Sequence, residues 1–489
     1  MINWVILPIP KIKSFKFKIF SFLLISLLTI CLSFSLITIH LYALISLEEE
    51  EKIGKEVLQE VSKNLSVIND PEAIAYVNLL GDILLKKGVT FSLFKFRFYI
   101  IKDKTFNAFS VPGGYIFLNT GLFDFLESED ELAGIMAHEM SHNLARHVAK
   151  RIETIKKMQM ATTAATLAAV FLGGSEAAQI VGITGTALAQ TKLLAYSRMD
   201  EEEADRMGFE ILTKAGFNPE AMVRTFQKLS RESSFSIELN YRYLLTHPLP
   251  PERINYLQNL SEKIFTNKKV DRYVLSQDPV YFKRLRKRII VYGEEPSDLI
   301  LTLKIRLSAE KDPWTKYQLA LALMQGRFFV EAEKYLKEVL TELPRKPYFE
   351  LDLAELYYQK GDYEKAKAIL TELNFSGGGI ARILDLKRKY LLAKVLSEIG
   401  DLKESYSLFK ELEEEGLIKE DPYFYYYFGL LCARLESLGE SHFYFAKFYE
   451  NKGDLKTAKY HYKKSLSLLK KDSKMYLEAK EKVEDDEKK

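Results

Sequence analysis

The segment His138-Glu139-Met140-Ser141-His142 restricts the possible folds of this chain most, because it places two imidazoles and a carboxylate within one helical turn. Positions i and i+4 share one face of an α-helix, so both rings can reach the same metal ion. Glu139 lies about 100° round the helix from His138, where it can take a proton from a water without binding the ion. Acidic residues at 129–131 favour a helix start just before the motif. The segment therefore predicts a helix with two metal ligands and a general base.

A second acidic helix, predicted over residues 196–205, offers a third ligand. Glu201 and Asp205 are four residues apart and share one of its faces. A glutamate ligand would complete a site of three protein ligands with an open fourth position, which is the arrangement of catalytic zinc. Asp205 can accept the free ring N–H of a ligating histidine and fix its orientation. The alternative for residues 201–203 is a solvated acidic face.

Together these residues resemble the gluzincin metalloendopeptidases of the HtpX and CAAX-prenyl-protease superfamily, because His-Glu-x-x-His is followed by Ser-Arg-x-x-Glu-x-x-Ala-Asp at residues 197–205. Within it the chain is most similar to the β-barrel assembly-enhancing protease type. The resemblance covers about residues 48–265 and includes the stretches 107–109, 112–116, 246–248 and 253–254. It implies one zinc ion per subunit and assigns the ligands to His138, His142 and Glu201, the general base to Glu139 and the supporting acid to Asp205.

The first residues of the chain predict its location. Residues 19–47 contain no Asp, Glu, Lys or Arg, and four lysines precede them. A basic start followed by a long apolar run inserts with its basic end in the cytoplasm. We therefore expect the chain after residue 48 to be periplasmic or otherwise extracytoplasmic and associated with the membrane. Residues 1–47 serve either as a cleaved signal peptide or as a membrane anchor.

Composition excludes some other classes of protein. Cys31 lies in the apolar start and Cys432 is far from it, so these two cysteines provide no disulfide framework. With 489 residues and 47% hydrophobic content, the chain can bury the cores of two or three domains. The net charge is only +3, and no basic patch with interleaved aromatic residues stands out, so a nucleic-acid partner is not supported.

The predicted catalytic domain, residues 48–265, combines helices with a few strands. Residues 94–101 alternate in polarity and residues 115–118 follow a Pro-Gly-Gly turn, which predicts a hairpin or small sheet. An extended peptide can add to the edge of such a sheet. The candidates for the rim of that edge, unless turn chemistry alone explains them, are Asn107, Gly113 and Gly114.

Residues 158–190 form an apolar segment in which Glu176 is the only charged residue. Its first part, up to Gly173, would make a helix of about 22 Å, too short for a bilayer core of about 30 Å. The segment is either a helical pair packed on the catalytic core or a lid or membrane contact that covers the cleft.

Two further histidines need an explanation. A histidine in a Pro-rich loop, such as His247, is usually a surface residue, but the resemblance places it in the cleft. We expect His247 either to donate a hydrogen bond to the oxyanion or to occupy the open coordination position in a resting state. On a continuous helix His147 would lie about 140° round from His142, as a structural residue or a group behind the ligands.

The composition changes past residue 265. Residues 266–310 are basic and predict a helical connector, and residues 311–475 carry recurring Gly turns before small helical residues. Gly326 and Gly361 are 35 positions apart, which resembles tetratricopeptide repeats of 34 residues. Because the spacing beyond Gly361 is irregular, the number of repeats could be four or five. Their helices would stack and form a concave groove. Residues 476–489 are expected to form a charged, frayed tail.

We therefore predict a mainly α protein, with an α+β zincin catalytic domain that has a small β-sheet, followed by a superhelix of tetratricopeptide repeats. The expected activity is that of an exported zinc metalloendopeptidase, in which Glu139 takes a proton from the attacking water and returns it to the leaving amine.

The resemblance implies that the substrates are unfolded or misassembled envelope and outer-membrane proteins, and that the repeats bind substrate or the outer-membrane assembly machinery. One alternative is a periplasmic chaperone or scaffold that acts through the repeats and has a latent peptidase. Another is a processing peptidase of narrow specificity. The sequence identifies neither the physiological substrates nor the oligomeric state.

Overall fold

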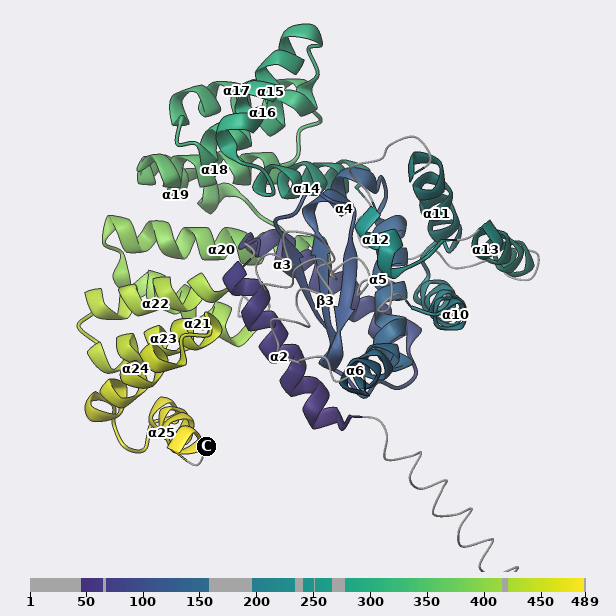
Figure 1. The fold of residues 1–489 in the computed structure, drawn as a ribbon. Helices are drawn as coiled ribbons and strands as arrows, with labels where there is room; N and C mark the ends of the chain where they lie inside the picture. Colours follow the sequence, from purple (N-terminus) through teal and green to yellow (C-terminus); the bar gives the residue numbers. More distant parts are fainter. Residues whose placement is uncertain are drawn as a thin grey trace, which may run out of the picture.

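The computed structural model describes residues 45–64, 67–157, 196–233, 241–249, 251–265, 278–415 and 421–487. This part of the chain is mainly helical and contains one three-stranded sheet (Figure 1). Residues 1–44 of the expected targeting segment and the apolar segment 158–190 lie outside the described residues. None of the described helices is both long and apolar enough to span a bilayer.

The sheet has the strand order β1-β3-β2. The central strand β3 (Tyr115–Asn119) pairs in parallel with β1 (Arg97–Ile101) and antiparallel with β2 (Ala108–Val111). The two strands predicted from the sequence are β1 and β3, whereas β2 is an additional strand of four residues. All four side chains of β2 are buried, and the strand lies at one edge of the sheet, against the helix that carries the His-Glu-x-x-His motif.

The expected rim residues are buried. Gly113 and Gly114 form the short helix η2 (Pro112–Gly114) with φ angles of +79° and +82°, a conformation that favours glycine. A Cβ atom at Gly114 would lie 2.8 Å from the carbonyl oxygen of Lys95. Asn107 is also buried. Turn geometry and close packing therefore account for the two glycines, as the alternative expected, and a place on a substrate rim stays a prediction.

The catalytic half of the molecule surrounds the sheet with helices. One face of the sheet packs with the motif helix in a buried cluster that continues into the second half of the molecule, and the other face packs with residues of helices 47–64 and 147–157 in a second cluster. The described helices of this half are α2 (Leu47–Asn64), α3 (Pro71–Ile83), the π-helix η1 (Leu84–Gly88), α4 (Thr120–Phe125), α5 (Glu129–Leu144), α6 (His147–Lys157), α10 (Arg198–Ala215), α11 (Glu220–Ser233), α12 (Tyr241–Thr246) and α13 (Pro251–Phe265).

The second half is a stack of helix pairs. Residues 278–310, expected to be part of a connector, form two helices, α14 (Pro279–Tyr292) and α15 (Pro296–Ala309), and both pack on the next helix, α16 (Pro313–Gln325). The helix pairs are α16 with α17 (Phe329–Glu342), α18 (Pro347–Lys360) with α19 (Tyr363–Glu372), α20 (Ile380–Ile399) with α21 (Leu402–Glu415), α22 (Pro422–Arg434) with α23 (Leu438–Asn451), and α24 (Leu455–Leu468) with α25 (Lys474–Glu487). Residues 474–487, expected to include a frayed tail, are helical, because Ala479 and Val483 bury one face of α25.

The stack lies alongside the catalytic half, with α20 next to α3 and α14 next to α4 (Figure 1). A group of buried or nearly buried charged side chains, which we call the junction cluster, joins the two halves. Three cations from the stack neutralise carboxylates from both halves. The members of the junction cluster are Asp70, Glu72, Arg284, Arg288, Asp352, Glu355 and Lys387.

The contacts of the junction cluster are short and numerous. Arg284 donates to Glu72 Oε1 at 2.5 Å and to Asp352 Oδ2 at 2.9 Å. Arg288 donates to Asp70 Oδ2 at 2.9 Å, and Lys387 Nζ to Glu72 Oε2 at 3.0 Å. Because Asp70 and Glu72 belong to the start of α3, the catalytic half occupies part of the repeat surface that we expected to be available for substrate.

Candidate metal centre

Helix α5 carries the motif in a fully buried setting. It starts after Ser128, whose hydroxyl accepts a hydrogen bond from the backbone N–H of Glu131 at 3.3 Å. His138, Glu139 and His142 are all 0% exposed. The side chains of the motif therefore face other protein groups rather than solvent, and each needs a partner or a ligand there.

Helix α10 brings Glu201 to the same place. Ser197 and Asp200 form a reciprocal capping box that fixes the start of this helix, and Glu201 follows in its first turn. Farther along, Gly208 packs against the backbone of α5, where a Cβ atom would lie 3.2 Å from the nitrogen of His138. The absence of a side chain at residue 208 thus allows α10 to approach the helix that carries the two histidines.

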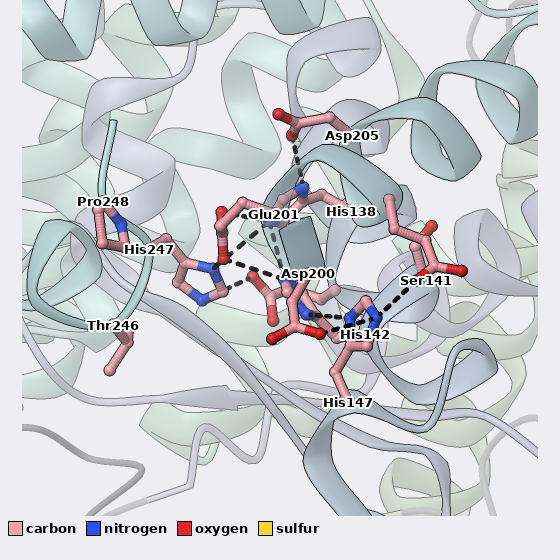
Figure 2. Close-up of polar contacts among 12 residues, drawn as sticks. His138, Ser141, His142, His147, Asp200, Glu201, Asp205, Thr246, His247 and Pro248 are labelled. Atoms are coloured by element: carbon pink, nitrogen blue, oxygen red, sulfur yellow. Dashed lines mark hydrogen bonds and ion pairs between the residues drawn. The ribbon is translucent and has the colours of Figure 1, made fainter. Parts of the chain in front are cut away.

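The candidate ligand atoms have the spacing of a metal site. His138 Nε2 and His142 Nε2 are 3.1 Å apart, and they lie 3.6 and 3.5 Å from Oε2 and Oε1 of Glu201. Nitrogen and oxygen atoms around a tetrahedral zinc ion would be roughly 3.3–3.5 Å apart. Figure 2 shows these side chains converging on one point. The structure thus brings together the three residues that the sequence analysis proposed as metal ligands.

His247 lies at the same point. Its Nδ1 is 3.4 Å from His138 Nε2 and 2.9 Å from Glu201 Oε1, so the four ligand groups fall within 4.8 Å of one another. The ring of Tyr243 stacks on the imidazole with centroids 4.4 Å apart. The structure therefore groups His247 with the three candidate ligands, and both roles expected for it, hydrogen-bond donor or fourth ligand, stay predictions.

Burial controls the charges of these groups. It lowers the pKa of His138, His142 and His247, which keeps the imidazoles neutral and able to bind a metal. Burial and the nearby charge of Glu201 raise the pKa of Glu139 well above its usual range. Burial also raises the pKa of Glu201 to about 7, against the opposing charge of Arg253. A divalent cation would favour the ionised form of both carboxylates.

Several buried polar atoms of the centre lack a hydrogen-bond partner within the described part of the chain. They include both carboxylate oxygens of Glu139 and the hydroxyl of Tyr243. Glu139 Oε1 is 3.5 Å from Nε2 of His247. Unpaired buried polar atoms are costly, so they indicate a place for an ion or a water. The donor set and these unpaired atoms both fit a bound metal ion.

Asp205 and Arg253 support the ligands. Asp205 Oδ1 lies 3.0 Å from Nδ1 of His138, which leaves Nε2 of that ring for the metal. Arg253 donates to both oxygens of Asp205, at 2.7 and 2.8 Å, contacts Glu201 at 2.5 Å, and donates to the carbonyl of Pro248 at 2.7 Å. Burial alone would raise the pKa of Asp205, but Arg253 outweighs it and the pKa is lowered.

Besides Tyr243, three residues of the centre had no expected role. Arg253 appeared in the sequence analysis only within a matching stretch, because its contacts with Glu201 and Asp205 join distant parts of the chain. Tyr196 stacks on His142 with ring centroids 3.7 Å apart, and Arg151 lies 4.1 Å from the centre of the Tyr196 ring. A pocket of about 180 Å³ reaches Glu201 from outside and is lined by Tyr196, Arg198, Glu201, Glu202, Pro248, Glu252 and Arg253.

This geometry defines a class of protein. A helix with His-Glu-x-x-His, completed by a glutamate from a second helix and set beside a small sheet, is the arrangement of a zincin-type metallopeptidase.

Comparison with known proteins identifies families to which parts of the chain are similar. Residues 78–261 match peptidase family M48, and residues 322–390 match the tetratricopeptide repeat. These matches confirm the expected resemblance, and the described helices confirm the mainly α fold.

Three relatives illustrate this similarity. The chain is 31% identical over 317 residues to a β-barrel assembly-enhancing protease of Yersinia pestis, a match that covers 64% of this chain and 63% of the relative. It is 30% identical to the protein of that name from Escherichia coli (strain K12), with 63% of each chain covered. The mitochondrial metalloendopeptidase OMA1 of Schizosaccharomyces pombe is 29% identical over 44% of this chain and 61% of its own length. The chain thus spans slightly less than two thirds of each of these relatives.

Proposed function

We propose that this chain is a zinc-dependent endopeptidase. The observation that supports it most is the set of four ligand atoms within 4.8 Å of one another, next to the buried Glu139, whose Oε1 lies 3.5 Å from Nε2 of His247. Three neutral imidazoles and one carboxylate suit zinc better than calcium or magnesium, which prefer oxygen ligands. When bound, the ion would supply a Lewis acid that lowers the pKa of a water and polarises a carbonyl oxygen.

Each residue has a separate task in this proposal. Glu139 takes a proton from the attacking water and returns it to the leaving amine, and its raised pKa suits it to holding that proton. Asp205 and Arg253 hold His138 and Glu201 in place. His247 occupies the fourth position in a resting arrangement, so its ring must withdraw before substrate or water can take that place.

We further propose an extracytoplasmic location and substrates among misfolded or misassembled outer-membrane proteins. The uncharged run at residues 19–47 after four lysines supports export. The similarity to bacterial β-barrel assembly-enhancing proteases supports a role in β-barrel assembly. The repeats would contribute by binding substrate or the assembly machinery, because stacked helix pairs commonly present binding surfaces.

Glu139→Gln tests the chemistry. The variant should bind one zinc ion per chain, as measured by elemental analysis, and should lose about 10²–10⁴-fold in kcat on an unfolded outer-membrane protein. It would also retain substrates for identification by mass spectrometry. If the wild-type protein, loaded with zinc, cleaves no such substrate faster than Glu139→Gln, the proposed activity is wrong.

His247→Ala tests the resting arrangement. Removal of this ring should leave zinc bound through His138, His142 and Glu201 but change the rate of peptide cleavage, because the fourth position is then free. The measurement is zinc content together with kcat and KM. Unchanged kinetics would show that His247 does not control access to the centre.

The position of His247 also favours a second candidate function, a chaperone or scaffold with a latent peptidase. A ring that fills the fourth position keeps the centre closed until something displaces it. In that case wild type and Glu139→Gln would prevent the aggregation of an unfolded β-barrel protein equally well, and neither would cleave it.

A further inference from the structure

The motif helix ends in an unusual turn. Helix α5 ends at Leu144, Ala145 and Arg146 form the turn, and α6 begins at His147. Arg146 has a φ angle of +56°, a left-handed conformation that non-glycine residues rarely adopt. Its side chain holds this turn on the catalytic core, because Nε donates to Glu50 of α2 at 2.9 Å.

This turn changes the place of His147. On a continuous helix, the ring would lie about 140° round from His142 and the two could not meet. In the structure Nδ1 of His147 lies 3.1 Å from Nδ1 of His142, and His147 is only 1% exposed. The expectation that both residues occupy one helix is therefore wrong, and the break in the helix explains their contact.

The distances determine the proton positions. His142 directs Nε2 to the metal position, so its proton must be on Nδ1. That N–H donates to Nδ1 of His147, which must then carry its own proton on Nε2. Nε2 of His147 lies 3.1 Å from Glu203 Oε2 and 3.4 Å from Asp200 Oδ1, both of which can accept it. Two imidazoles and a carboxylate pair thus form one chain of hydrogen bonds behind the second ligand.

The two ligating histidines are supported in different ways. His138 contacts Asp205 directly, and this carboxylate is 0% exposed and paired with Arg253. The chain behind His142 instead runs through His147 to the surface, where the side chains of Glu203 and Asp200 are 46% and 28% exposed.

We propose that His147 is a positioning residue of the metal centre. It accepts the Nδ1 proton of His142 and is itself oriented by Glu203 and Asp200, so that the ring of His142 is held in the tautomer and orientation that bind a divalent ion. This inference rests on the proposed function, because it requires a metal ion at the centre. Loss of such an orienting partner typically weakens metal binding about 10–100-fold.

The test measures zinc affinity rather than catalysis. The metal-free forms of wild type, His147→Leu and His147→Asn compete for zinc with a coloured chelator. We expect about 10–100-fold weaker binding for His147→Leu. His147→Asn should fall between it and wild type, because the amide oxygen can lie near the former Nδ1 and accept the His142 proton. Val148→Ala is the matched control, since this buried neighbour packs among apolar residues and its loss should leave zinc affinity unchanged.

The outcomes separate this inference from the proposed function. Wild-type protein that binds no zinc would contradict the proposed function. Two outcomes would contradict only the role of His147, provided that wild type binds zinc. In the first, the zinc affinity of His147→Leu lies within about threefold of wild type. In the second, His147→Asn and His147→Leu bind zinc equally weakly. If His147→Leu does not fold, as judged by circular dichroism, the zinc affinity of His147→Gly is measured with and without added imidazole. Recovery of zinc affinity supports the role, and no recovery contradicts it.

Discussion

The metal centre and the junction cluster are both buried groups of ionisable side chains, but they differ in whether every carboxylate is paired with a cation. In the junction cluster each carboxylate meets at least one cation at 3.1 Å or less. In the metal centre both oxygens of Glu139 have no hydrogen-bond partner within the described residues. Unpaired buried groups cost free energy, so a fold retains them where a ligand or a reaction uses them. The difference thus separates a site for chemistry from a connection between two halves of a molecule.

The largest expected effect is on stability, from Arg284→Leu in the junction cluster. This change leaves Glu72 and Asp352 without their bidentate partner, and loss of one member of a buried charge pair costs about 3–5 kcal/mol. Urea titration should show that decrease in the free energy of unfolding.

The matched control is Lys337→Ala, whose ammonium lies 2.8 Å from Glu333 but is 59% exposed. An exposed ion pair of this kind should contribute less than about 0.5 kcal/mol to the free energy of unfolding. If the two variants were equally stable, the junction cluster would not hold the two halves together.

Metal removal should have the next largest effect. A ligand that binds only the folded state at a free concentration a hundred times its Kd adds about 2.7 kcal/mol to the free energy of unfolding. Treatment with a chelator should remove that stability, and zinc should restore it. His142→Ala should lose most of this response, whereas Arg284→Leu should keep it. If the wild-type protein unfolded identically with and without zinc, the metal centre would not differ from the junction cluster in binding an ion.

The smallest expected effect is a loss of folding stability at acid pH. Burial alone would raise the pKa of Glu355, but Arg288 and Lys387 outweigh it and lower the pKa to about 2. Because this folded pKa is below the unfolded value, the stabilisation is fully present above about pH 4.5 and is lost as the pH falls towards about 2. Between about pH 5 and about pH 3 the loss attributable to Glu355 should be about 1–2 kcal/mol.

Glu355→Gln should remove that part of the pH dependence. Unfolding titrations at several pH values should therefore give a shallower acid limb for the variant than for wild type. If the free energy of unfolding falls equally steeply with acid in both proteins, the contacts of Glu355 in the junction cluster do not lower its pKa.

Local patterns predicted much of the centre. His138, Glu139 and His142 lie within one helical turn, and Glu201 and Asp205 are four residues apart, so helical geometry alone places each group on one face. The expected position of His147 was wrong because no Gly or Pro marks the helix break at Arg146. The left-handed turn there is held by a contact with the distant Glu50.

Contacts between distant parts of the chain were not predictable in the same way. Glu72 and Arg284 are 212 positions apart, and nothing in either local sequence indicates the other. Strand β2 was missed because four residues are too few for a clear alternation. The repeat half was easier, since its Gly turns recur at intervals, although the buried face of α25 was hidden by the many charges around it.

Arg253 couples the loop that carries His247 to the candidate metal centre. The same guanidinium that contacts Glu201 also donates to the carbonyl of Pro248, the residue that follows His247. Displacing the loop as a whole would break this hydrogen bond and leave Glu201 with a less fixed partner. The backbone beside His247 and the carboxylate of Glu201 should therefore shift together rather than independently.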